Sequence, residues 1–234
     1  MAWLAGVDGC RNGWFRVCRE TASGELAFGV LETVEDLVAE APTPAIVCLD
    51  MPIGLPAEGS RACDLEARKR LGERRSSVFS APVRSALSAG SREQASEITT
   101  RVDGRRVTAQ AWAIYPKIRA VDEALTTSKA ARSAIREVHP EVSFWAWNGR
   151  RPMAFSKKKA EGVAERLALV EEWLGGGVLS RARGRYLRRD LADDDVLDAI
   201  AGLWTAHRMA AGEAETLPAS PPRDETGLPM QIVF

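Results

Sequence analysis

Four aspartates lie at positions where a carboxylate is costly unless a cation neutralises it. Asp8 ends the apolar segment Trp3-Leu4-Ala5-Gly6-Val7, and Asp50 ends a second one, Ala45-Ile46-Val47-Cys48-Leu49. Asp195 and Asp198 lie near the start of a late helix-forming stretch. Acids at the mouth of a hydrophobic core need a positive partner, and carboxylate oxygens are suitable ligands for hard divalent cations. The arrangement predicts a Mg²⁺ or Mn²⁺ site and therefore phosphate chemistry.

The acidic run 193–195 also has a simpler interpretation, because aspartate is favoured at the N-terminus of a helix. Helix capping does not account for Asp198, which lies about 60° around the helix from Asp195. The two carboxylates therefore point in similar directions. Beside them, Ala199, Gly202 and Ala206 form a narrow stripe of small residues where another backbone segment could approach closely.

The segment Glu137-Val138-His139-Pro140-Glu141 contains one of only two histidines. We expect Pro140 to fix the chain at a strand end just before Glu141, which is the next candidate metal ligand or general base. His139 is a candidate for a phosphate contact or for orienting a water molecule, although a structural histidine fits equally well. The second histidine, His207, falls on the apolar face of its helix and is expected to be packed rather than catalytic.

Cationic and hydroxyl side chains that suit phosphate oxygens gather in three places. A solvated surface is the alternative interpretation for such charge runs. The candidate substrate-binding residues are Arg74, Arg75, Ser76, Ser77 and Lys117, together with His139 and the run Ser156-Lys157-Lys158-Lys159.

The hydrophobic periodicity predicts strands over 3–8, 14–19 and 26–31, a short helix near 33–40 and a buried strand over 45–49. A helix over 60–72 stops at Gly72, and a charged, helix-forming region with breaks at Pro82 and Pro116 extends to about residue 133. Strand character returns at 135–139. Helices follow over 160–174 and 193–210, and a last strand is expected at 230–233.

The composition is that of a globular protein without a global electrostatic preference. The 234 residues are 45% hydrophobic and carry 32 basic and 32 acidic side chains, so a formal net charge of zero draws the chain neither to nucleic acid nor to lipid. The four cysteines form no C-x-x-C pair, and no apolar run approaches the roughly 20 residues of a membrane helix. We expect a cytoplasmic protein without a membrane segment, folded as a single domain over 1–234 with a helical insertion at about 57–133.

Five motifs together resemble a bacterial family. The motifs are Gly6-Val7-Asp8-Gly9-Cys10-Arg11-x-Gly13-Trp14, Asp50-Met51-Pro52-Ile53-Gly54-Leu55-Pro56, Arg74-Arg75-Ser76-Ser77-Val78-Phe79, His139-Pro140-Glu141-Val142-Ser143-Phe144 and Asp194-Asp195-x-x-Asp198-Ala199. The chain is similar to domain-of-unknown-function family 429, described as predicted nucleases of the ribonuclease H-like fold. This resemblance covers nearly the whole chain.

The order of the predicted elements, three antiparallel strands and then alternating helices and strands, is also that of the ribonuclease H-like fold, an α/β fold with a mixed five-stranded sheet. Within that superfamily, Holliday-junction resolvases are similar in placing one acid on the first strand, one after the fourth and a D-x-x-D pair on the last helix. Asp8, Asp50, Asp195 and Asp198 occur in matching order, whereas Glu141 has no counterpart in that scheme.

The leading prediction is a Mg²⁺- or Mn²⁺-dependent nuclease that hydrolyses phosphodiester bonds. The predicted catalytic and metal-binding residues are Asp8, Asp50, Glu141, Asp195 and Asp198. The chain lacks the glycine-rich loops of P-loop and Rossmann proteins and the G-x-S-x-G motif of acyl hydrolases. Two alternatives remain: a nucleotide-binding ATPase or small-molecule phosphotransferase of the actin-like type, and a non-catalytic binding module. The expected partner is nucleic acid or a phosphorylated small molecule.

Overall fold

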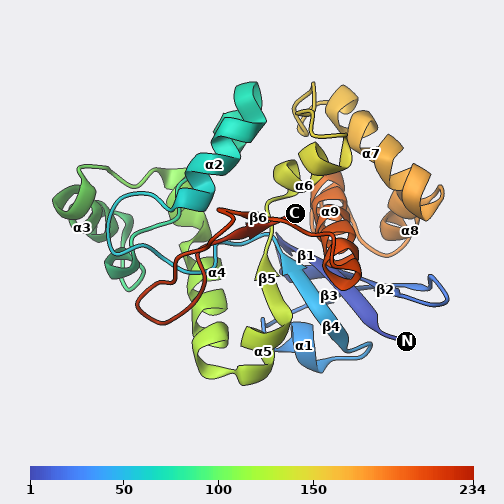
Figure 1. The fold of residues 1–234 in the computed structure, drawn as a ribbon, viewed down its shortest axis with the longest axis horizontal. Helices are drawn as coiled ribbons and strands as arrows, with labels where there is room; N and C mark the ends of the chain where they lie inside the picture. The colour runs from blue at the N-terminus through green and yellow to red at the C-terminus, as the bar shows by residue number, and fades with distance from the viewer.

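The protein is an α/β structure built around one mixed five-stranded sheet. The computed structural model describes residues 1–234, and Figure 1 shows the sheet beneath two groups of helices. The strand order is β3-β2-β1-β4-β5. β1 pairs antiparallel with β2 and parallel with β4, β2 pairs antiparallel with β3, and β4 pairs parallel with β5. The strands are β1 (Trp3–Cys10), β2 (Gly13–Glu20), β3 (Leu26–Leu31), β4 (Pro44–Leu49) and β5 (Ile135–Glu137).

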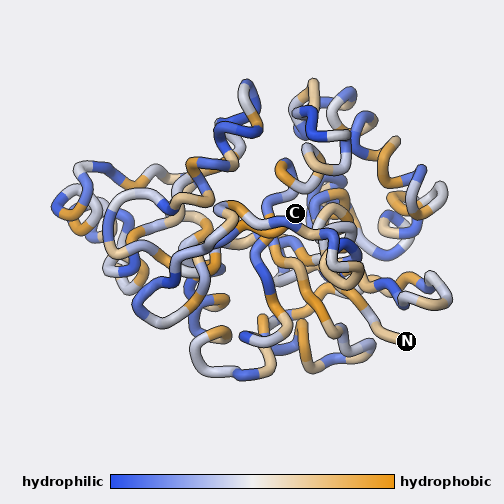
Figure 2. The backbone as a smooth tube through the Cα atoms, viewed as in Figure 1, coloured by the Kyte–Doolittle hydropathy of each residue, from blue (hydrophilic) through white to orange (hydrophobic).

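Helices cover both faces of this sheet. On one face, Val7 and Leu49 pack with α1 (Asp36–Ala39), α4 (Ala109–Thr127) and α5 (Lys129–Ala134). On the other face, Leu4 and Cys48 pack with the helices of the C-terminal half, which are α6 (Pro140–Trp147), α7 (Ala160–Leu174), α8 (Val178–Arg183) and α9 (Asp193–Ala211). Figure 2 shows hydrophobic residues concentrated along the strands. Because successive side chains of a strand alternate between faces, Asp8 shares the α9 face with Leu4.

The chain between β4 and β5 is helical. It contains α2 (Ala62–Leu71), the 3₁₀ segments η1 (Gly72–Ser77) and η2 (Arg84–Ala86), α3 (Arg92–Asp103), α4 and α5. The predicted break at Pro116 is wrong, because Pro116 lies inside α4. α2 projects on the same side of the molecule as α7 (Figure 1), and its outer end is hydrophilic (Figure 2).

α9 packs very closely against β1. A Cβ on Gly6 would lie 1.9 Å from the carbonyl oxygen of Ala199, and a Cβ on Gly202 would lie 2.9 Å from that of Cys48. The predicted close approach at the small-residue stripe is therefore present, and the two glycines make it possible. This contact fixes the N-terminal end of α9 above β1.

The remaining elements lie near the C-terminus. β6 (Thr216–Leu217) and β7 (Ile232–Val233) form a two-stranded sheet, and a bridge from Val233 to Val138 joins it to the end of β5. Pro140 begins α6 instead of ending a strand, since proline is well suited to the first turn of a helix. None of the helices combines the length and the hydrophobicity that crossing a bilayer requires.

Candidate metal centre

Three of the predicted acids meet at one point of the structure. A carboxylate oxygen from each of Asp8, Asp50 and Asp198 lies within 4.8 Å of the other two. Asp8 and Asp198 are buried, and Asp50 is partly buried. We refer to these three residues as the acidic triad.

The register of the two central strands brings Asp8 and Asp50 together. Val7 is the partner of Leu49 in the parallel pairing of β1 with β4, and the backbone N–H of Asp50 donates to the carbonyl of Val7 at 3.0 Å. Asp8 follows Val7 and Asp50 follows Leu49, so the two aspartates lie side by side. Asp198 lies on α9, which packs on one face of the sheet. The close approach of α9 to β1 at Gly6 and Gly202 sets the distance of Asp198 from the sheet.

A lysine supplies the positive charge nearest to the acidic triad. The ammonium group of Lys157 donates to Oδ2 of Asp198. The other oxygen of Asp198, Oδ1, is buried without a hydrogen-bond partner. Oδ1 of Asp8 accepts from the N–H of Gly9 at 2.6 Å. Three carboxylates thus share one ammonium group, which leaves their charge incompletely neutralised.

Burial and mutual repulsion change the proton affinity of the acidic triad. Burial raises the pKa of Asp8 well above its usual value, and the charges of Asp50 and Asp198 add to the effect. Burial, followed by the charge of Asp198, raises the pKa of Asp50 to about 8. The pKa of Asp198 is also raised by burial, although Lys157 opposes the shift. Such shifts indicate that a further cation would bind in competition with protons.

The two other predicted ligands have partners of their own. Asp195 is in the first turn of α9, where its carboxylate accepts from the N–H of Ala192 at 2.9 Å. Both carboxylate oxygens of Glu141 accept from Arg166 Nη2, at 2.6 and 2.8 Å. Asp195 thus caps its helix, and Glu141 forms a buried ion pair between α6 and α7. Neither belongs to the acidic triad.

A cavity of about 200 Å³ opens beside Asp8 and Asp50. Lys117 and His139, two of the predicted substrate-binding residues, line it. The ammonium group of Lys117 donates to the Gly13 carbonyl at 2.7 Å and lies 4.4 Å from the centre of the Trp14 ring, and burial lowers its pKa.

One ring nitrogen of His139 has no hydrogen-bond partner. Its Nε2 is 3.3 Å from the carbonyl oxygen of Ser77. Its Nδ1 is buried without a hydrogen-bond partner, and burial lowers the pKa of the ring. A neutral imidazole therefore lines the cavity.

The other predicted substrate contacts lie away from the cavity wall. Arg74, Arg75, Ser76 and Ser77 form most of η1, where the Ser77 hydroxyl donates to the Arg74 carbonyl. Arg75, Ser76 and Ser77 are exposed and Arg74 is half-buried. The contact of His139 with Ser77 ties this segment to the start of α6. His207 contacts the Trp173 ring far along α9, outside the acidic triad and the cavity beside it, and its non-catalytic role stays a prediction.

Sequence reasoning missed a buried network in the wall of the cavity. Arg61 donates to both oxygens of Glu137 at 2.7 Å and to Asp64 Oδ1 at 2.6 Å, while Glu137 also accepts from the N–H of Ile53 at 2.6 Å. This network holds the loop that follows Asp50. The i, i+3 spacing of Arg61 and Asp64 on α2 was the only available signal, since Glu137 is remote in sequence.

The acidic triad suits a hard divalent cation. All its donors are carboxylate oxygens, which Mg²⁺, Mn²⁺ and Ca²⁺ prefer. Ligands at about 2.1 Å from an octahedral ion are about 3 to 4.2 Å apart, close to the spacing present, and the unpartnered Oδ1 of Asp198 provides a free ligand atom. The acidic triad could therefore hold a metal ion.

Comparison with known proteins yields one match. A profile of the family described as "Protein of unknown function (DUF429)" matches residues 6–223. Neither a curated protein nor a solved structure matches the chain.

Proposed function

The chain belongs to the DUF429 family, as its motifs predicted, and from the site we propose that it is a Mg²⁺- or Mn²⁺-dependent nuclease of the ribonuclease H-like superfamily. The observation that carries the proposal is the convergence of Asp8, Asp50 and Asp198 within 4.8 Å. The strand order β3-β2-β1-β4-β5, with β2 antiparallel to its neighbours, supports it, because this is the order expected of that fold.

The reaction would be hydrolysis of a phosphodiester by water. A divalent ion, when bound, activates the attacking water and stabilises the charge that develops on the phosphate oxygens. Asp8, Asp50 and Asp198 would hold it. Asp198 would use its unpartnered Oδ1, and Lys157, which donates to Oδ2, would add a second positive charge beside the site. His139 lines the cavity wall and would contact water or substrate there.

Glu141 and Asp195 act indirectly in this proposal. Arg166, held by Glu141, also donates to the carbonyls of Phe155 and Gly162, so the ion pair supports the loop that carries Lys157. The cap at Asp195 fixes the first turn of α9, and Asp198 lies in the next turn. Both are positioning residues.

The proposal is tested with purified protein in Mg²⁺ and then Mn²⁺, against single-stranded, duplex, branched and RNA–DNA hybrid substrates. Asp8→Asn should reduce cleavage by at least about a thousandfold, because a metal ligand is lost. The matched control is Asp194→Asn, since Asp194 lies on the same helix as Asp198 but pairs with the exposed Lys158. Equal cleavage by wild type and Asp8→Asn, or no cleavage with either metal, would refute the proposal.

The balanced net charge of the protein favours a second candidate, a hydrolase or transferase of small phosphorylated molecules. A volume of about 200 Å³ admits such a molecule, and the net charge of zero lacks the excess of basic residues that strengthens nucleic-acid binding. Release of phosphate from small phosphate esters, with no cleavage of nucleic acid and with the same dependence on Asp8, would select it.

A further inference from the structure

A second and larger cavity has a different chemical character. It has a volume of about 360 Å³ and lies between β5, α5 and the C-terminal segment 221–231. Only Glu137 lines both this cavity and the one beside the acidic triad. Three arginines, Arg132, Arg136 and Arg223, line it. We call it the arginine cavity.

None of the three arginines forms an ion pair. Each is held by a backbone carbonyl: Arg132 by Thr226 at 2.9 Å, Arg136 by Ile135 at 2.7 Å and Arg223 by Gly227 at 2.6 Å. A guanidinium group has five N–H donors, so donors remain on each. Carbonyl contacts orient these groups without neutralising them.

Glu137 is the only acid that lines the arginine cavity, and the acids next to the cavity form ion pairs with other arginines. Glu137 is bonded through both oxygens to Arg61, and Asp224 and Glu225 both pair with Arg84. The lining of the arginine cavity therefore has three cationic side chains and one acidic one, and an anion with several acceptor oxygens would balance the excess positive charge.

The rest of the wall is apolar. Leu125, Ile135 and Leu228 contribute hydrophobic surface, and Gln231 contributes an amide. Small-molecule sites combine such a wall with a few convergent polar groups and typically have volumes of about 300 to 1,000 Å³. An inorganic ion alone would leave most of this wall uncovered.

We propose that the arginine cavity binds a phosphate monoester of a small organic molecule. The phosphate contacts Arg132, Arg136 and Arg223, and the organic part packs against Leu125 and Leu228. No residue of the acidic triad lines this cavity, so binding requires no metal and does not depend on the proposed nuclease activity.

Titration calorimetry in EDTA tests the proposal, with adenosine 5′-monophosphate, glucose 6-phosphate, inorganic phosphate and adenosine as probes. We expect at least one of the two monoesters to bind about tenfold or more tightly than inorganic phosphate, because it also buries an organic part, and adenosine to show no binding. If neither monoester binds, the proposal is wrong. If inorganic phosphate binds as tightly as both monoesters, the cavity recognises the anion only and the organic part of the proposal is overturned.

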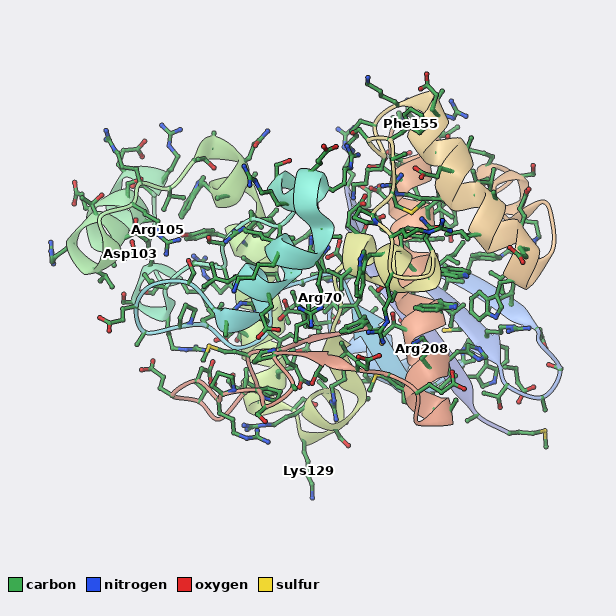
Figure 3. The ribbon with its side chains drawn as sticks, turned by 45° about the horizontal axis from the view of Figure 1, so that its top comes forward. Arg70, Asp103, Arg105, Lys129, Phe155 and Arg208 are labelled. Atoms are coloured by element: carbon green, nitrogen blue, oxygen red, sulfur yellow. The ribbon has the colours of Figure 1, made fainter.

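Variants locate the site. The double substitution Arg132→Gln with Arg223→Gln should weaken monoester binding about tenfold or more, because it removes two charge-assisted contacts at exposed positions. The matched control is Lys129→Gln with Arg101→Gln: it removes the same charge, and Lys129 lies on the same helix as Arg132 but points away from the protein (Figure 3). Unchanged binding in the first variant, or equal weakening in both, would overturn the assignment. Asp8→Asn should bind as wild type does.

Discussion

The acidic triad and the Glu141–Arg166 pair both place carboxylates in the interior of the protein. They differ in how completely the negative charge is neutralised. Glu141 has a dedicated arginine that contacts both its oxygens. In the triad, Asp8, Asp50 and Asp198 share one lysine, and one oxygen of Asp198 has no partner. A buried acid that is fully paired supports the structure. A group of incompletely neutralised acids favours the binding of a further cation.

Removing Arg166 from the Glu141–Arg166 ion pair should have the largest effect on stability. Arg166→Met leaves Glu141 buried without its partner, and breaking a buried pair costs about 3 to 5 kcal/mol in the free energy of unfolding. Urea denaturation measures the loss. Adding Glu141→Gln to that variant should restore part of it. A loss below about 1 kcal/mol would mean that the pair is not structural.

A substitution in the acidic triad should increase the stability of the protein instead of reducing it. Asp50→Asn removes a repelling charge, so in EDTA at pH 8 we expect the free energy of unfolding to rise by about 1 to 2 kcal/mol. The same variant should lose Mn²⁺ binding, measured by calorimetry. Destabilisation in EDTA would show that the carboxylate of Asp50 supports the fold, and the contrast with Glu141 would disappear.

The pH dependence of stability should separate the two regions further. The folded-state pKa of Asp50 is raised to about 8, above an unfolded value of about 3.9. Its contribution is therefore fully present below about pH 4 and is lost as pH rises through about 8. Thermal melts in EDTA between pH 5 and 8.5 should show a decline that Asp50→Asn reduces. Saturating Mn²⁺ should oppose the decline, because metal affinity rises as protons leave.

Lys157→Gln should produce the smallest effect on stability. It removes the ammonium group beside Asp198, so we expect a loss of about 1 kcal/mol in EDTA at pH 8 and a smaller loss in saturating Mn²⁺, where the metal supplies the positive charge. Differential scanning calorimetry with and without Mn²⁺ measures both. An equal loss in both conditions would indicate that Lys157 has a packing role unrelated to the charge of the triad.

Much of this fold was predictable because local patterns encode it. A continuous apolar run between turn residues predicted strand 26–31 with the observed limits, and Gly175 marked the end of α7. The sequence did not reveal α6, because its apolar residues are not confined to one face. It did not reveal the helix through Pro116 either, because a proline inside a helix usually breaks or kinks it.

By itself, the sequence determined the family, the two aspartates that follow the apolar segments of the central strands and the small-residue stripe that lets α9 approach β1. Asp8 does not end its strand as predicted, because β1 continues to Cys10. Tertiary structure alone decided which acids have partners. Arg166 is 25 residues from Glu141, Lys157 is 41 from Asp198 and Arg61 is 76 from Glu137. The free energy of a buried charge depends on the groups that packing brings within a few ångströms, and residue order along the chain does not specify those groups.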